Sequence, residues 1–93
     1  MNRHDRGLRL LVREFLEGTR TFADFHEAFL SRWTRLPPRA LAPAARERWN
    51  EVFALVLTTI ADPVAGEDLA RGVIGEAELR RRLLQHPVLA GPA

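Results

Sequence analysis

The sequence predicts an all-α protein: a single-domain, four-helix antiparallel bundle over residues 1–93. Three observations support this prediction. In four segments the apolar residues recur every three or four positions, the spacing of one helical face. No segment alternates apolar and polar residues for long enough to make a convincing strand. Short connections rich in Gly and Pro separate the segments, and short connections favour neighbouring helices that pack antiparallel.

The first helix is expected over residues 5–17. Its apolar side chains fall on one face: Leu8, Leu11, Val12, Phe15 and Leu16. Gly18 follows directly, and glycine is the residue best suited to the left-handed conformation that closes many helices.

The second helix is expected over residues 22–35. Thr21 is predicted to be its N-cap, with the hydroxyl accepting a hydrogen bond from the amide of Asp24. Four aromatic residues recur on one face: Phe22, Phe25, Phe29 and Trp33. A stripe of this kind indicates core packing, and Pro37 and Pro38 end the helix.

The third helix is expected over residues 43–61 and the fourth over residues 76–85. Pro43 suits a first helical position, where its missing N–H costs nothing. Between the two helices, residues 63–74 are predicted to form a loop with at most one helical turn near Asp68 to Arg71. Gly75 is predicted to be the N-cap of the last helix, and Pro87 ends it.

Composition excludes several classes of protein. The chain has no Cys, so disulfides and thiolate metal sites are absent. No apolar run reaches the roughly 18 residues of a membrane-spanning helix, and no signal peptide is recognisable, so we expect a cytoplasmic protein with no membrane partner. All 14 basic residues are Arg and the formal net charge is only +2, which is weak evidence for a nucleic-acid-binding protein.

No catalytic or metal-binding constellation is evident. The three histidines, His4, His26 and His86, include no pair at the spacing of a helical metal site. The hydroxyl residues lack a nucleophile motif, and the segment from Gly72 to Gly75 lacks the spacing and the Lys of a phosphate loop. We therefore expect no enzyme activity, no cofactor, no metal and no small-molecule substrate.

The run Arg80-Arg81-Arg82 has two interpretations. Glu76 and Glu78 lie four residues before Arg80 and Arg82, the favourable spacing for ion pairs on a helix surface. The run is therefore predicted to be a solvated, charge-paired helical face. Contact with RNA or DNA is the alternative interpretation.

Acidic residues are harder to explain by local pairing. Glu47 and Glu51 lie four residues apart, a spacing at which like charges repel on a helix. Asp62, Glu67 and Asp68 follow, so the third helix and its exit are predicted to form an acidic edge for a basic partner. Neutralisation by neighbouring Arg residues or by water is the alternative, and Asp62 also suits a turn before proline.

The sequence resembles the self-protective colicin-like immunity proteins, the family of the colicin D immunity protein. Five segments carry the resemblance: Leu11 to Gly18, Phe22 to Phe25, Phe29 to Trp33, Glu51 to Phe53 with the Asp62-Pro63 exit, and Ile74 to Arg80. The matching segments cover most of the chain in the same order. Their shared features are hydrophobic spacing and helix caps.

The resemblance implies a four-helix immunity protein that binds the nuclease domain of a cognate bacterial toxin, often a tRNA-cleaving one. It implies that acidic residues block the basic cleft of that nuclease. By position these acids are Glu51 and Asp62, with Glu47, Glu67 and Asp68 as neighbours. The chain departs from the family in its slightly basic charge and in residues 57–60, which are Leu-Thr-Thr-Ile where acids are expected.

Two other classes of function remain open at this point. One is a small helical nucleic-acid-binding or regulatory domain that uses Arg32, Arg35, Arg39 and the Arg80 to Arg82 run. The other is an adaptor whose exposed apolar face binds another helix. A steep salt dependence of RNA or DNA binding would identify the first, and a large apolar surface patch the second.

Overall fold

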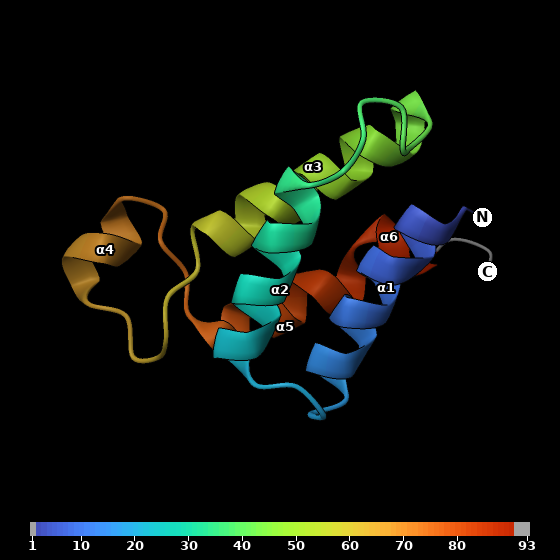
Figure 1. Ribbon diagram of the computed structural model, residues 1–93. Helices are drawn as coiled ribbons and strands as arrows, with labels where there is room; N and C mark the ends of the chain where they lie inside the picture. The colour runs from blue at the N-terminus through green and yellow to red at the C-terminus, as the bar shows by residue number, and fades with distance from the viewer. Residues whose placement is uncertain (1, 91–93) are drawn as a thin grey trace.

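The computed structural model describes residues 2–90 and is predominantly helical (Figure 1). Its elements are α1 (Arg3–Leu16), α2 (Phe22–Thr34), α3 (Pro43–Leu57), α4 (Gly66–Ala70), α5 (Glu76–Gln85) and α6 (Pro87–Ala90). The prediction of an all-α protein is confirmed for this part of the chain. None of the helices between residues 2 and 90 combines the length and the apolar character needed to cross a membrane.

The corner between α1 and α2 forms as its residues predict. Gly18 has a φ of 83°, the left-handed conformation that favours glycine. The Thr21 hydroxyl accepts a hydrogen bond of 3.1 Å from the Asp24 amide, so the N-cap prediction is confirmed. At the start of α1 the Asn2 side chain caps the helix by accepting from the amide of Asp5 at 2.8 Å.

Four helices enclose the core. Contacts run from α1 to α2, from α2 to α3, from α3 to α5 and from α5 back to α1, while α6 packs on α3 and α5. We call α1, α2, α3, α5 and α6 the helical body. The helix α4 projects away from it at one end (Figure 1).

Aromatic side chains dominate the contact between α1, α2 and α3. Phe15 and Phe25 stack with ring centroids 4.5 Å apart, and Phe29 packs against Trp49 at 6.2 Å. All four are essentially inaccessible to solvent, which confirms that the aromatic stripe of α2 is core at Phe25 and Phe29. Trp49 also donates a 2.6 Å hydrogen bond from Nε1 to the carboxylate of Asp5, which satisfies its only polar group.

The helix α3 ends at Leu57, not at residue 61 as predicted. After Leu57 the chain pairs with Ile74 as an isolated parallel bridge: Ile74 donates to the Thr58 carbonyl and accepts from Ile60 N, both at 2.9 Å. The hydroxyl of Thr59 bonds to the Leu55 carbonyl at 2.6 Å. Hydroxyl side chains that bond back to the helix compete with its continuation, and β-branched residues favour extended backbone.

The remaining differences are short helices. The helix α4 begins at Gly66, slightly before the single turn predicted near Asp68 to Arg71. After Pro87 ends α5, the chain forms α6, which places Val88 in the core with 3% of its surface exposed. The helix α6 therefore packs on α3 and α5 and completes the helical body.

Candidate binding surfaces

The five predicted partner-binding acids do not form one cluster. Glu47 and Glu51 lie in the first part of α3, whereas Glu67 and Asp68 lie on α4 (Figure 1). Ten helical residues separate Glu47 from the end of α3 at Leu57, a rise of about 15 Å at 1.5 Å per residue. The helix α4 lies beyond that end, so the predicted acidic edge is divided into separate parts.

Glu51, whose side chain is 61% exposed, bonds to one buried side chain of the protein. Its Oε1 lies 3.0 Å from Nε2 of His86, a side chain with only 9% of its surface exposed. The other ring nitrogen of His86, Nδ1, accepts a 3.2 Å hydrogen bond from the amide of Val88. Because Nδ1 is an acceptor, Nε2 carries the proton and donates to Glu51. This bond ties α3 to the junction of α5 and α6.

Asp62 caps the last long helix from a distance. Its Oδ2 accepts a 3.0 Å hydrogen bond from the amide of Ala77, in the first turn of α5. Gly75 is the N-cap residue, as predicted, but it has no side chain to bind those amides. A Cβ at Gly75 would collide with the Asp62 carboxylate, so the absent side chain is what lets Asp62 approach. The carboxylate therefore has a structural role that its position in the sequence did not reveal.

The acids of α4 remain available to a partner. Glu67 and Asp68 occupy its first turn, and neither side chain forms an ion pair or hydrogen bond with the residues that the structure describes. Glu47 is likewise exposed on α3. Of the five predicted acids, therefore, two are engaged in internal bonds and three are not.

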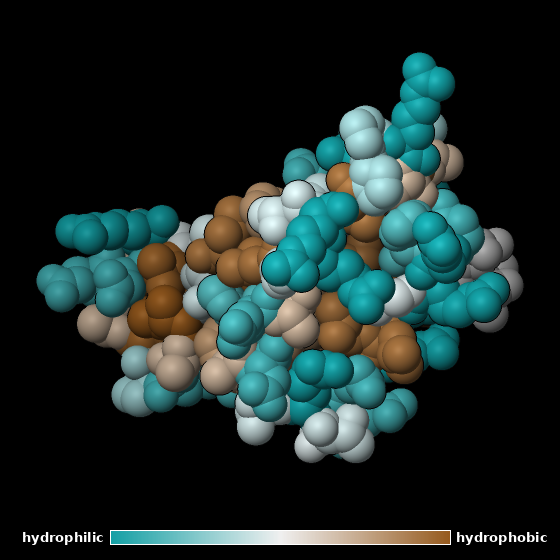
Figure 2. Space-filling view, in the orientation of Figure 1, coloured by the Kyte–Doolittle hydropathy of each residue, from teal (hydrophilic) through white to brown (hydrophobic). Residues whose placement is uncertain are grey.

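Three exposed apolar side chains belong to the C-terminal end of α3, the segment after it and α4, whereas two others, Leu10 and Leu84, lie on α1 and α5. Leu57, Ile60 and Leu69 expose 54%, 42% and 56% of their surfaces. Figure 2 shows hydrophobic residues over the C-terminal end of α3 and beside α4. We call this region the α3–α4 face and define it by five residues: Leu57, Ile60, Glu67, Asp68 and Leu69. Sequence reasoning missed its apolar part because it assigned residues 57 and 60 to the buried side of a longer helix.

Each arginine of the Arg80 to Arg82 run is paired, as predicted. Arg80 pairs with Glu76 at 3.0 Å, donates to the Phe15 carbonyl at 2.7 Å and lies over the Phe15 ring. Glu78 pairs with both Arg82 and Arg81. Hydrogen bonds from Arg81 first, and from Arg82 second, lower the pKa of Glu78 from 4.5 to about 2. Three arginines share two glutamates, so the run and its partners keep a net charge of about +1, which weakens but does not remove the alternative of nucleic-acid contact.

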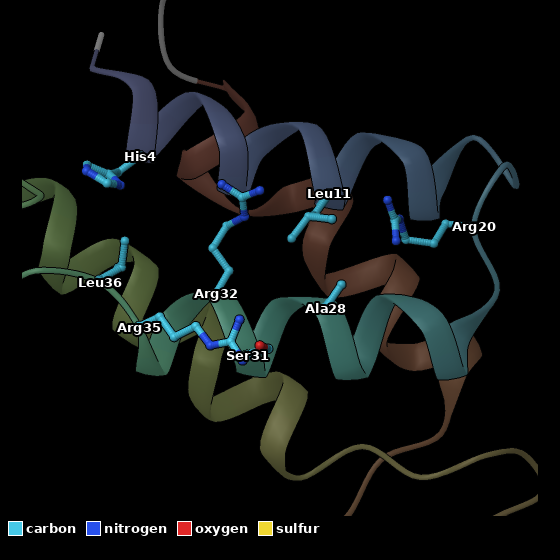
Figure 3. Close-up of a pocket in the computed structure, with 8 residues that line it drawn as sticks. All are labelled: His4, Leu11, Arg20, Ala28, Ser31, Arg32, Arg35 and Leu36. Carbon is cyan, nitrogen blue, oxygen red and sulfur yellow. The ribbon is translucent and has the colours of Figure 1, made fainter.

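A second surface lies between α1 and α2, and it contains Arg32 and Arg35, which the sequence offered only as part of a nucleic-acid-binding alternative. It is a hollow of about 450 Å³ lined by the following residues: His4, Leu11, Arg20, Ala28, Ser31, Arg32, Arg35 and Leu36 (Figure 3). We call it the α1–α2 groove. An adjoining hollow of about 270 Å³ shares Arg20, Ala28 and Ser31 with it and adds Asp24 and Glu27.

The charge of the α1–α2 groove is concentrated at one end. Arg20 is paired with Glu14 at 3.0 Å, whereas Arg32 and Arg35 form no ion pair within residues 2–90. Arg32 reaches from α2 across to α1, where its guanidinium lies over Gly7 (Figure 3). In the sequence, the one sign of this positive charge is that neither Arg32 nor Arg35 has an acidic residue three or four positions away.

The described residues contain no group of three or more His, Asp or Glu side chains placed to hold a metal ion. Both surfaces are therefore suited to binding by charge and apolar contact. No protein-family model, curated protein or solved structure matches this chain.

Proposed function

We propose that this protein is an immunity protein, which binds the nuclease domain of a cognate bacterial toxin of the tRNA-cleaving class and inhibits it in the cytoplasm. In this proposal α1, α2, α3 and α5 correspond to the four helices of an antiparallel immunity bundle. The resemblance in the sequence supports this proposal, and so does the closed ring of contacts between these helices.

The observation that carries the proposal is the composition of the α3–α4 face. Leucine and isoleucine side chains are exposed there beside two carboxylates that have no partner in the described chain. Exposed apolar groups of this kind characterise protein-binding surfaces. Because α4 projects from the body, its carboxylates can enter a concave partner (Figure 1).

The proposed mechanism is stoichiometric obstruction. Glu67 and Asp68 attract the Arg and Lys residues of a nuclease cleft and so speed the encounter. Leu57, Ile60 and Leu69 lose their contact with water in the complex, and this apolar burial slows dissociation. Glu51 and Asp62 act on the structure of the face: their internal bonds hold α3, α5 and the segment between them, which contains α4, in place. This division of roles revises the five-acid surface expected from the sequence.

The proposal expects a nuclease domain to be encoded beside this chain's gene, and that domain is the partner used in the test. Cleavage of tRNA is measured as the protein is added, and inhibition is expected to be complete at one molecule per nuclease. The double variant Glu67→Lys/Asp68→Lys should weaken inhibition by about tenfold or more, since like charges then face each other.

The matched control is Glu17→Lys/Glu47→Lys, which makes the same change in net charge at two exposed positions outside the α3–α4 face. It should inhibit as the natural protein does. Equal weakening by both variants would contradict the proposed surface, and a lack of any inhibition would contradict the proposed function.

A further inference from the structure

We propose that the α1–α2 groove binds a small phosphate-bearing ligand of the nucleoside monophosphate class, with the phosphate held by Arg32 and Arg35. This proposal is independent of the proposed inhibition of a nuclease, because that proposal depends on the acidic α3–α4 face and this one depends on the basic α1–α2 groove. It rests on the charge, size and polarity of the groove.

The charge of the groove matches a phosphate. Arg32 lies in the last turn of α2, and Arg35, three positions later, is the C-cap residue of the same helix. Neither has an acidic partner in the described chain. Two guanidinium groups balance a phosphate monoester, which carries about −1.5 to −2 charges at neutral pH. A single carboxylate would neutralise only one of them.

Polar groups at the same end can complete the phosphate site. The Ser31 hydroxyl from α2 and the His4 imidazole from α1 line the hollow together with the two arginines (Figure 3). The planar guanidinium group can donate two parallel hydrogen bonds to one phosphate. Figure 3 shows the Arg32 guanidinium reaching α1 and the Arg35 side chain lying along α2, so the donors flank the hollow from both walls.

The rest of the groove suits the remainder of a nucleotide. The volume of about 450 Å³ falls within the usual range of small-molecule sites. The half-buried side chains of Ala28 and Leu36 offer a small apolar surface, whereas Leu11 exposes only 6% of its surface. In the adjoining hollow Asp24 and Glu27 offer carboxylate acceptors for hydroxyl or amino groups. A ligand with an anionic head and a donor-bearing tail would use both ends.

The experiment is calorimetric titration of the full chain with four probes: inorganic phosphate, adenosine monophosphate, uridine monophosphate and a ten-nucleotide single-stranded RNA. The monophosphates are expected to bind at least tenfold more tightly than inorganic phosphate, because they also fill the apolar and acidic parts. The RNA is expected to bind no more tightly than a monophosphate. Tighter binding of RNA, or no binding by either monophosphate, would overturn the proposal.

The decisive variant is Arg32→Gln/Arg35→Gln, which removes both charges from exposed side chains and keeps their polar character. Its affinity for the monophosphates should fall by tenfold or more, since hydrogen bonds to charged groups are the strong ones. The matched control, Arg48→Gln/Arg71→Gln, makes the same change in net charge at exposed positions outside the groove. An equal fall in the control would show non-specific attraction and overturn the proposal.

Gly7 provides a second variant that leaves every charge in place. A Cβ at Gly7 would collide with the Arg32 guanidinium, the mobile end of a long side chain. Gly7→Ala should therefore displace Arg32 and lower the affinity by at least threefold, while α1 remains folded because alanine favours helix. An unchanged affinity would contradict the placement of the phosphate beside Gly7.

Discussion

The α3–α4 face and the α1–α2 groove differ in charge, shape and support. The face is acidic and apolar, and part of it lies on a short helix that projects from the body (Figure 1). The groove is basic, and its walls are two long helices held together by the stacked rings of Phe15 and Phe25. One surface is suited to enter a partner, and the other is suited to receive a ligand.

The difference shows that a charged residue is informative only once its partners within the chain are known. Glu51 and Asp62 were expected to bind a partner, yet one bonds to His86 and the other caps α5. Arg32 and Arg35 attracted less attention than the Arg80 to Arg82 run, yet it is the run that is paired. The two surfaces use four of the charges that have no partner in the described chain: Glu67, Asp68, Arg32 and Arg35.

The largest expected effect is on the free energy of unfolding, and it tests whether the α1–α2 groove is more tightly packed than α4. Phe25 is fully buried between the walls of the α1–α2 groove, so Phe25→Ala should lower the free energy of unfolding by about 3–5 kcal/mol. Leu69 is 56% exposed, so Leu69→Ala should change it by less than about 0.5 kcal/mol. Urea denaturation followed by circular dichroism measures both. Similar losses would mean that α4 is as firmly packed as the groove.

The next effect separates the two kinds of acid. Asp62→Ala removes the bond to the Ala77 amide and should cost about 1 kcal/mol, the usual value of a lost helix cap. Glu67→Ala should change the free energy of unfolding by less than about 0.5 kcal/mol, because Glu67 is exposed and its side chain forms no bond within the described chain. The same denaturation assay applies. If Glu67→Ala were the more destabilising, the assignment of internal and external roles would be reversed.

A smaller effect has the opposite sign. Gly7→Ala should raise the free energy of unfolding by up to about 1 kcal/mol, since it replaces glycine inside α1 with the best helix former. The added methyl group meets the flexible end of Arg32 and no backbone atom. A rise in the midpoint of thermal unfolding is the expected observation. Destabilisation would mean that Arg32 cannot move aside.

The smallest expected effect is on the stability of the protein at acidic pH. The pKa of Glu78 is lowered from 4.5 to about 2, so its stabilising effect is fully present above about pH 4.5 and is lost as the pH falls towards 2. Glu78→Gln should therefore flatten the dependence of stability on pH within that window and leave the slope near pH 7 unchanged. Denaturant titrations between pH 2 and 7 test this, and an unchanged acid slope in the variant would contradict it.

Most of the helices could be predicted from the sequence because their ends are local. Thr21 caps a residue three positions away, and Gly18 adopts its conformation without help from distant residues. The end of α3 could not be predicted in this way, since Thr58 and Ile60 pair with Ile74, far along the chain. Hydrophobic spacing alone continued the helix through these residues.

The candidate sites depend even more on distant contacts. The roles of Asp62 and Glu51 are set by residues 15 and 35 positions away. Arg9 is another example: it belongs to the polar part of the α1 pattern but exposes only 9% of its surface. A groove between two helices likewise exists only after the helices pack. Sequence spacing identified the local partners of Arg80 and Arg82, but not the distant partners of Glu51 and Asp62.

The central claim is that the α3–α4 face, and not the acids along α3, meets a basic nuclease cleft. The most direct measurement is the association rate of the neighbouring gene's nuclease domain with the natural protein and with Glu67→Lys/Asp68→Lys, at low and high salt. The account predicts a rate about tenfold lower for the variant at low salt, with the difference largely removed at high salt. Equal rates for the two proteins at low salt would contradict it.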